Sequence, residues 1–178
     1  KQSGNLLYLI GQTYDELGGS EYYRLKGFLG STVPKVRLSQ ARKIFGIVSK
    51  AIGSGLIKAC HDLSEGGLAV AAAEMAFAGG HGLELDLRNV PREGCDRDDF
   101  ILFSESNSRF LVEVPEKAMN EFGDLMNGKA CSKVGKVTKS PRLCVRGLSS
   151  DVVVDAQLSD LLRSWKRTLS SGGVSLEA

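Results

Sequence analysis

Residues 59–68 constrain the fold of this chain more than any other stretch, because an apolar run there gives way to a polar turn and then to two adjacent glycines. After the glycines the side chains are mostly small and apolar up to Ala78, apart from Glu74. A helix that is apolar all round is typical of an interior position, where only its polar end reaches solvent. We therefore expect a strand over 56–60, a turn, and an interior helix over 67–78.

The polar turn before this helix supports two interpretations. A helix N-terminus presents unpaired N–H groups and a positive dipole end, and Gly66 and Gly67 would let a phosphate approach the backbone. Alternatively, Asp62 and Glu65 have the spacing of a capping box, which is purely structural. Because both are acidic, a phosphate there requires Mg²⁺ as a bridge or carboxylates turned into the fold. His61 is a candidate acid or base, or simply a hydrogen-bonded side chain.

Composition indicates one globular domain and excludes several classes of protein. The chain has 178 residues, 42% of them hydrophobic and 25% charged, with a net charge of +2. Its basic residues look scattered, which argues against a nucleic-acid surface. No apolar run approaches the ~20 residues of a membrane span, and no signal peptide precedes the first strand. The chain does not begin with Met, so we expect a piece of a longer protein.

The four cysteines favour free thiols in a reduced cytoplasm. They contain no CxxC pair and only two histidines accompany them, so a zinc site is not expected. Cys60 and Cys144 lie in apolar, strand-like runs and are interpreted as core residues.

The remaining pattern alternates strands and helices. A helix is expected over 21–25 with Ser20 as its cap, and a second one is capped by Ser39. Further helices are expected after Pro115 and after Asp155, which is the candidate cap of the last one. The helix after Pro115 has Met119 on its inner face, and the last helix buries apolar side chains that include Trp165 and Leu169. Strands are expected over 5–10, 83–87, 110–114, 132–137, 143–146 and 152–154.

A polar cluster over 104–109 lies between two buried segments and is the second candidate site. Glu105, Ser106 and Asn107 are candidate ligand contacts, with a self-satisfied turn in which Glu105 pairs with Arg109 as the alternative. Residues 123–130 nearly spell a P-loop, but Ala130 stands where the Mg²⁺-binding hydroxyl belongs and the pattern lies at a helix C-terminus. We therefore reject a phosphate site there.

Three separated motifs resemble the second half of phosphoribosylformylglycinamidine synthase, the glutamine-dependent ligase of purine synthesis. The resemblance covers nearly the whole chain, and its motifs lie at 61–70, at 7–11 with 16–21, and at 102–106 with 109–112. Other members of the wider superfamily share the glycine loop: aminoimidazole ribonucleotide synthetase, the hydrogenase maturation dehydratase, selenophosphate synthetase and thiamine monophosphate kinase.

The resemblance implies an α+β fold, a three-layer α/β/α domain with a mixed sheet that is partly ferredoxin-like. It implies one C-type domain over 1–178, with an ordered core over 1–170 and a tail over 171–178. The family enzyme converts formylglycinamide ribonucleotide, ATP and glutamine-derived ammonia into the amidine, ADP and phosphate. It uses Mg²⁺ and works in the cytoplasm.

The resemblance also limits what this copy does. The reaction site is built mainly by the first half and by the preceding N-type domain, so no catalytic residue and no metal ligand is assigned here. By pseudo-symmetry, Glu105, Ser106 and Asn107 match a Glu-Ser-Gln that contacts substrate. The residues proposed to bind phosphate, nucleotide or substrate are His61, Asp62, Ser64, Glu65, Gly66, Gly67, Glu105, Ser106 and Asn107.

Two roles therefore remain open for this domain. It contacts a phosphate of the nucleotide or ribonucleotide, or it is a packing module that binds no cofactor itself. As a packing module it positions the N-type domain or docks the glutaminase partner. The isolated domain is expected to be inactive, and neither nucleic acid nor a membrane is expected as a partner.

Overall fold

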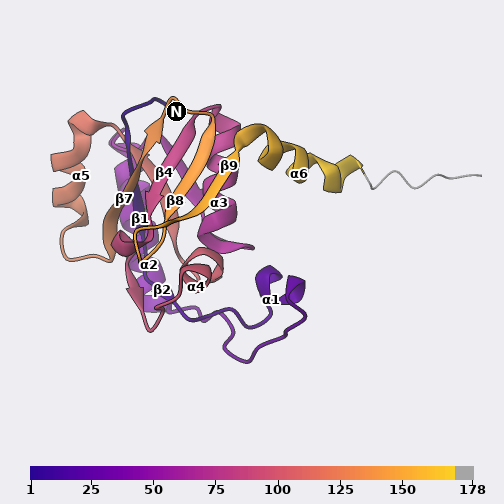
Figure 1. The fold of residues 1–178 in the computed structure, drawn as a ribbon. Helices are drawn as coiled ribbons and strands as arrows, with labels where there is room; N and C mark the ends of the chain where they lie inside the picture. Colours follow the sequence, from indigo (N-terminus) through magenta and orange to yellow (C-terminus); the bar gives the residue numbers. More distant parts are fainter. Residues whose placement is uncertain (171–178) are drawn as a thin grey trace, which may run out of the picture.

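The computed structural model describes residues 1–170, and the side chains of residues 1–167 (Figure 1). The expected tail over 171–178 and the side chain of Leu169 lie outside the described part. The strands are β1 (Leu6–Ile10), β2 (Thr13–Tyr14), β3 (Ala59–Asp62), β4 (Gly82–Asp86), β5 (Arg92–Glu93), β6 (Phe110–Val114), β7 (Cys131–Thr138), β8 (Arg142–Arg146) and β9 (Val152–Gln157). The helices are α1 (Glu21–Leu25), α2 (Leu38–Gly53), α3 (Gly67–Gly79), α4 (Asp98–Phe103), α5 (Met119–Met126) and α6 (Leu158–Ser170), with 3-10 turns at Leu87–Asn89 and Glu116–Ala118.

Seven strands form one mixed sheet in the order β3-β6-β1-β7-β4-β8-β9. Neighbours pair antiparallel except β4 and β8, which are parallel. The first strand lies in the middle because it pairs with β6 on one side and β7 on the other. β2 and β5 form a separate parallel pair of two residues each.

Helices cover both faces of the sheet, which confirms the expected mixed α+β, three-layer arrangement. Alternation along β1 sends Leu7 and Leu9 to one face and Ile10 to the other. The first face packs against α3, α4 and α6, and the second packs against α2 and α5 over β6 and β1. The second face of β4, β7, β8 and β9 carries charged pairs instead, such as Lys136 with Glu84 at 3.1 Å.

Most expected elements are present, and the exceptions have local causes. Ser20 Oγ accepts from the Tyr23 amide and caps α1, as expected. α2 begins at Leu38 without a side-chain cap, so Ser39 is not its cap. Asp155 does not cap α6 because it lies within β9 and forms an ion pair with Arg142.

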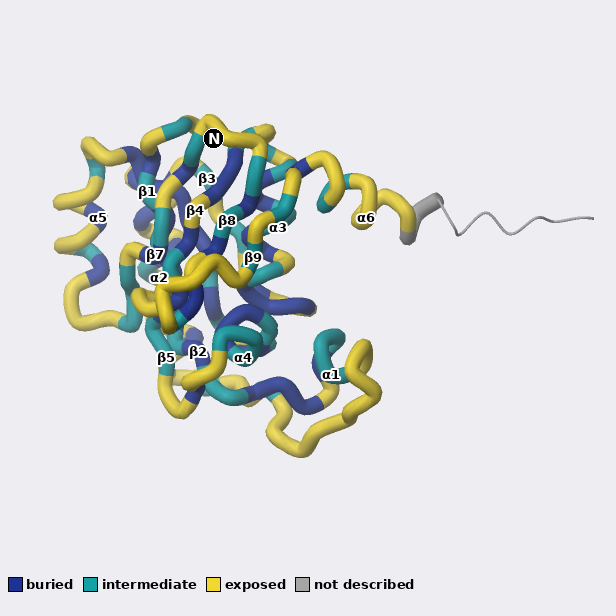
Figure 2. Tube along the Cα trace, viewed as in Figure 1, coloured by how far each residue is buried: buried dark blue, intermediate teal, exposed yellow. Residues whose placement is uncertain are grey.

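Three side chains expected in the core are exposed. Cys60 lies on β3, the edge strand of the sheet, and points to solvent, so the core assignment was wrong. Met119 on α5 is 39% exposed, and Trp165 on α6 is 47% exposed. α6 extends away from the sheet (Figures 1 and 2). The Trp165 ring lies beside Phe77 of α3, at 5.8 Å between ring centroids.

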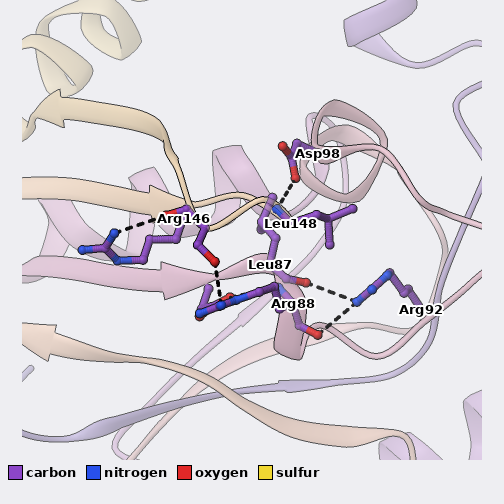
Figure 3. Close-up of polar contacts among 8 residues, drawn as sticks. Leu87, Arg88, Arg92, Asp98, Arg146 and Leu148 are labelled. Carbon is purple, nitrogen blue, oxygen red and sulfur yellow. Dashed lines mark hydrogen bonds and ion pairs between the residues drawn. The ribbon is translucent and has the colours of Figure 1, made fainter.

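Polar contacts attach α4 to the turn after β8 and brace the turn after β4 (Figure 3). Asp98, the first residue of α4, accepts from the Leu148 amide at 2.7 Å. Arg92 donates to the carbonyls of Leu87 at 3.4 Å and Arg88 at 3.1 Å, which ties the chain after β4 into a turn. These contacts fix the helix that leads into the polar cluster at 104–109.

Every helix within residues 1–170 falls short of the length or the apolar character that a bilayer crossing needs.

Candidate functional site

The two polar segments singled out in the sequence, 61–67 and 104–109, lie side by side at one end of the sheet. β3 and β6 pair antiparallel, so the end of the first strand meets the start of the second. The Leu63 amide donates to the Arg109 carbonyl at 3.0 Å, and the Gly66 amide donates to Glu105 Oε1 at 2.9 Å. Candidate residues more than thirty positions apart therefore belong to one site.

Glu105 caps α3, and the capping box expected from Asp62 and Glu65 is wrong. The cap position of α3 is Gly66, which receives no local side-chain cap. Asp62 cannot cap the helix because β3 continues through it and pairs it with Phe110. The same oxygen of Glu105 also accepts from the Glu21 amide at 3.1 Å, so one carboxylate joins the starts of α3 and α1.

Both glycines at the start of α3 are explained by packing. Gly66 and Gly67 have φ values of 75° and 60°, which favour glycine. A Cβ on Gly67 would lie 2.3 Å from the Ser104 carbonyl oxygen, so the helix start and the end of α4 touch backbone to backbone. The Gly67 amide donates to the Ser64 carbonyl at 3.0 Å. Neither amide is free for an anion in this structure.

Arg109 holds the polar cluster together from inside the protein. Its side chain is fully buried and donates to the Ser106 carbonyl (2.9 Å), the Ser104 carbonyl (2.5 Å) and Thr13 Oγ1 (3.0 Å). Burial lowers the pKa of the guanidinium to about 10, which still leaves it charged at neutral pH. The expected Glu105–Arg109 pair is not formed, because Arg109 donates to carbonyls of the cluster and to Thr13, while Glu105 accepts from backbone amides of other segments.

The two serines of the cluster attach it to the strand β2. Ser104 Oγ donates to the Tyr14 carbonyl at 2.7 Å, and Ser106 Oγ accepts from the Tyr14 amide at 3.0 Å. Both serines are fully buried. Ser106 therefore positions the loop in this structure and does not reach solvent.

His61 is turned away from the cluster, toward α3 and α6. Its Nε2 lies 2.9 Å from Glu74 Oε2, and its Nδ1 lies 2.6 Å from the Asp62 carbonyl oxygen. Trp165 Nε1 donates to the other oxygen of Glu74 at 3.0 Å. These contacts match the hydrogen-bonded interpretation of His61 and also link three elements, β3, α3 and α6.

Four of the nine candidate residues expose their side chains: Asp62, Ser64, Glu65 and Asn107. Asn107 lines a small cleft together with Tyr14, Lys35 and Arg37. The Arg37 guanidinium stacks over the Tyr14 ring at 3.5 Å. Among the described residues, no group of three or more His, Cys, Asp or Glu side chains lies close enough together to hold a metal ion.

Sequence reasoning missed the buried Glu16. Its Oε1 accepts from Arg37 Nη2 at 2.9 Å, while its Oε2 has no hydrogen-bond partner. Its backbone carbonyl accepts from the Glu105 amide at 3.2 Å, which connects it to the cluster. An acidic residue directly before Leu17, inside a motif of the resemblance, was the available signal.

Comparison with known proteins assigns the fold family. Residues 2–147 match the family described as "AIR synthase related protein, C-terminal domain". The chain belongs to this family. The sequence motifs therefore identified the right superfamily.

Curated members of this family that resemble the chain are subunits of phosphoribosylformylglycinamidine synthase. The PurL subunit of Methanothrix thermoacetophila is 46% identical over 123 residues, which cover 68% of this chain and 16% of that protein. The PurL subunit of Moorella thermoacetica is 36% identical over 172 residues, covering 95% of this chain and 22% of that protein. The chain thus spans roughly a fifth of these relatives.

Solved structures with similar folds include the following two. A structure titled "T. maritima PurL complexed with FGAR" matches with a TM-score of 0.77 and 19% identity, covering 90% of this chain and 28% of that one. The hydrogenase maturation protein HypE of E. coli matches with a TM-score of 0.63 and 18% identity, covering 88% of this chain and 49% of that one. Identity at this level supports the fold alone.

Proposed function

We propose that the chain is a C-type domain from the second half of a phosphoribosylformylglycinamidine synthase. This cytoplasmic enzyme is an ATP-dependent C–N ligase of purine synthesis. It joins glutamine-derived ammonia to formylglycinamide ribonucleotide and releases ADP and phosphate. The observation that carries the proposal is the 36% identity to a PurL subunit across 95% of this chain. The match to HypE, with a lower TM-score, gives less support to another superfamily member.

Within the enzyme, this domain positions the site, and its exposed residues contact the ligand. Glu105, Ser106, Gly66 and Gly67 are held by the protein's own groups, so they shape the site. Solved relatives with titles naming complexes with FGAR and with ATP support a ribonucleotide and a nucleotide as ligands of the whole enzyme. Asn107 is the exposed residue that we assign to ligand contact, with Asp62, Ser64 and Glu65 on the neighbouring turn.

Mg²⁺ and the catalytic residues belong to other parts of the enzyme under this proposal. The described residues offer no cluster of three ligating side chains, so they do not form a complete Mg²⁺ site by themselves. The preceding N-type domain and the first half of the enzyme are the partners that supply it. A solved structure titled "Structure of PurLQS from Thermotoga maritima" supports a multi-subunit parent that includes the glutaminase.

A kinetic experiment on the full-length enzyme tests both the ligase assignment and the ligand contact of Asn107. Asn107→Ala should raise the KM for formylglycinamide ribonucleotide roughly three- to tenfold, because one neutral hydrogen bond to the ligand is lost. The midpoint of unfolding should stay unchanged. Ser49→Ala on the exposed side of α2 is the control and should change neither quantity. A wild-type enzyme without ATP-dependent amidine formation would overturn the ligase assignment. An unchanged KM in Asn107→Ala would remove only the ligand contact.

A further inference from the structure

The charge of the chain is strongly segregated. Every charged residue between Tyr22 and His61 is Lys or Arg, eight in all, and the stretch contains no Asp or Glu. The rest of the chain holds the other fifteen Lys and Arg against all twenty-one Asp and Glu. The basic residues are therefore not scattered, contrary to the expectation from composition.

Part of this stretch also exposes large apolar side chains. We call residues 24–38 the basic loop. Its cations are Arg24, Lys26, Lys35 and Arg37. Six large apolar side chains in it are between 52% and 79% exposed: Leu25, Phe28, Leu29, Val33, Val36 and Leu38. The basic loop runs from the end of α1 to the start of α2 and is exposed over nearly its whole length (Figures 1 and 2). Isolated exposed apolar residues are ordinary, but six within one short segment indicate an interaction surface.

The basic loop is held in shape by contacts at its base. The Gly18 amide donates to the Thr32 carbonyl at 2.8 Å, and the Gly19 amide donates to the Leu29 carbonyl at 2.7 Å. A Cβ on Gly30 would lie 2.6 Å from the Tyr23 ring, so the backbone packs directly on that aromatic side chain. The apolar side chains therefore point outward on a fixed backbone and do not close onto the domain's own core.

We propose that the basic loop docks an acidic protein surface with an apolar centre, supplied by the part of the parent polypeptide outside these 178 residues. The inference rests on the proposed function, since the PurL relatives are more than four times as long as this chain. Charge selects the occupant, because the loop contains no carboxylate. Arg24 pairs with Glu21 and Arg37 with Glu16, but Lys26 and Lys35 add positive charge that complements an acidic surface. A second copy meeting the same loop through two-fold symmetry would bring like charges together.

The position of the loop connects this interface to the candidate site. Arg37, at the end of the loop, forms its ion pair with the buried Glu16. The Glu16 carbonyl in turn accepts from the Glu105 amide, and Glu105 caps α3. A partner seated on the loop thus lies next to the cleft that Asn107 lines, so it borders the ligand-contact residue.

Hydrogen exchange read by mass spectrometry tests the inference, comparing the 178-residue chain with the full-length polypeptide. Peptides covering 25–38 should exchange at least about tenfold more slowly in the full-length protein, because docking excludes solvent from the loop. Lys26→Glu with Lys35→Glu should remove that protection. Lys129→Glu with Lys139→Glu, which makes the same charge change at exposed positions elsewhere, should retain it.

Three results would overturn the docking role. Equal exchange of 25–38 in the two proteins would show that nothing in the parent covers the loop. Self-association of the 178-residue chain that protects 25–38 would make the occupant a second copy. Co-sedimentation of this chain with phosphatidylserine vesicles through 25–38 would identify the occupant as a membrane surface. Amidine formation by the same full-length preparation is measured in parallel, so failure of the ligase assignment is seen separately.

Discussion

Replacing Gly67 by alanine tests whether this glycine exists for packing. The residue has φ 60°, and a left-handed conformation costs a residue with a Cβ about 1–2 kcal/mol. The new Cβ would lie 2.3 Å from the Ser104 carbonyl oxygen and 2.9 Å from that of Leu102. Both obstacles are backbone atoms, so α3 must shift away from α4, and overpacking of this kind typically costs about 1–3 kcal/mol. We expect Gly67→Ala to lower the free energy of unfolding by about 2–5 kcal/mol.

Two matched glycines separate the contributions. Gly80, at the other end of α3, has φ 66° but open space around a Cβ, so Gly80→Ala should show only the backbone cost of about 1–2 kcal/mol. Gly46, in the interior of α2, has neither constraint, and Gly46→Ala should stabilise by about 0.5–1 kcal/mol. Urea unfolding followed by the single Trp165 measures all three. A Gly67→Ala change no costlier than Gly80→Ala would refute the packing explanation.

Three further predictions concern the buried contacts and their charges. Arg109→Met should lower the free energy of unfolding in urea by at least about 3 kcal/mol, since its acceptors stay buried without a donor; a smaller loss would contradict the assigned network. Inorganic phosphate at about 20 mM should leave the melting temperature unchanged, because the Gly66 amide is already engaged, and a clear rise in a thermal melt would show that it is not. The hydrogen bond from Arg97 lowers the pKa of Asp99, so its stabilisation is present above about pH 4 and lost as pH falls through the lower folded pKa. Asp99→Asn should therefore flatten the fall of stability in acid, measured by urea unfolding between about pH 5 and 2.

Local sequence signals were sufficient for elements with local causes. The run of small apolar residues ending at Gly79 and Gly80 predicted α3 almost to its bounds, and Gly80 ends it in the left-handed conformation. Ser20 predicted the start of α1 because an N-cap acts within three residues. Alternating apolar residues predicted β6 over Phe110–Val114.

Contacts between distant segments were beyond the same signals. The cap of α3 comes from Glu105, thirty-nine positions after Gly66, so the nearby Asp62 looked like the better candidate. Cys60 has an apolar neighbourhood in sequence, but its exposure depends on β3 being the edge strand, which only sheet order decides. Likewise, a polar run before a strand gives no indication that Arg109 is fully buried.

The geometry of the site divides its residues into two kinds, and the division decides how mutants should be interpreted. Glu105 accepts from two backbone amides that start α1 and α3, so its removal disturbs the fold before it disturbs a ligand. Asn107 is exposed, so its truncation leaves the scaffold intact. Activity lost together with stability at Glu105 is the signature of a positioning residue. Activity lost at constant stability at Asn107 is the signature of contact with substrate, and the two substitutions together distinguish a binding domain from a packing module.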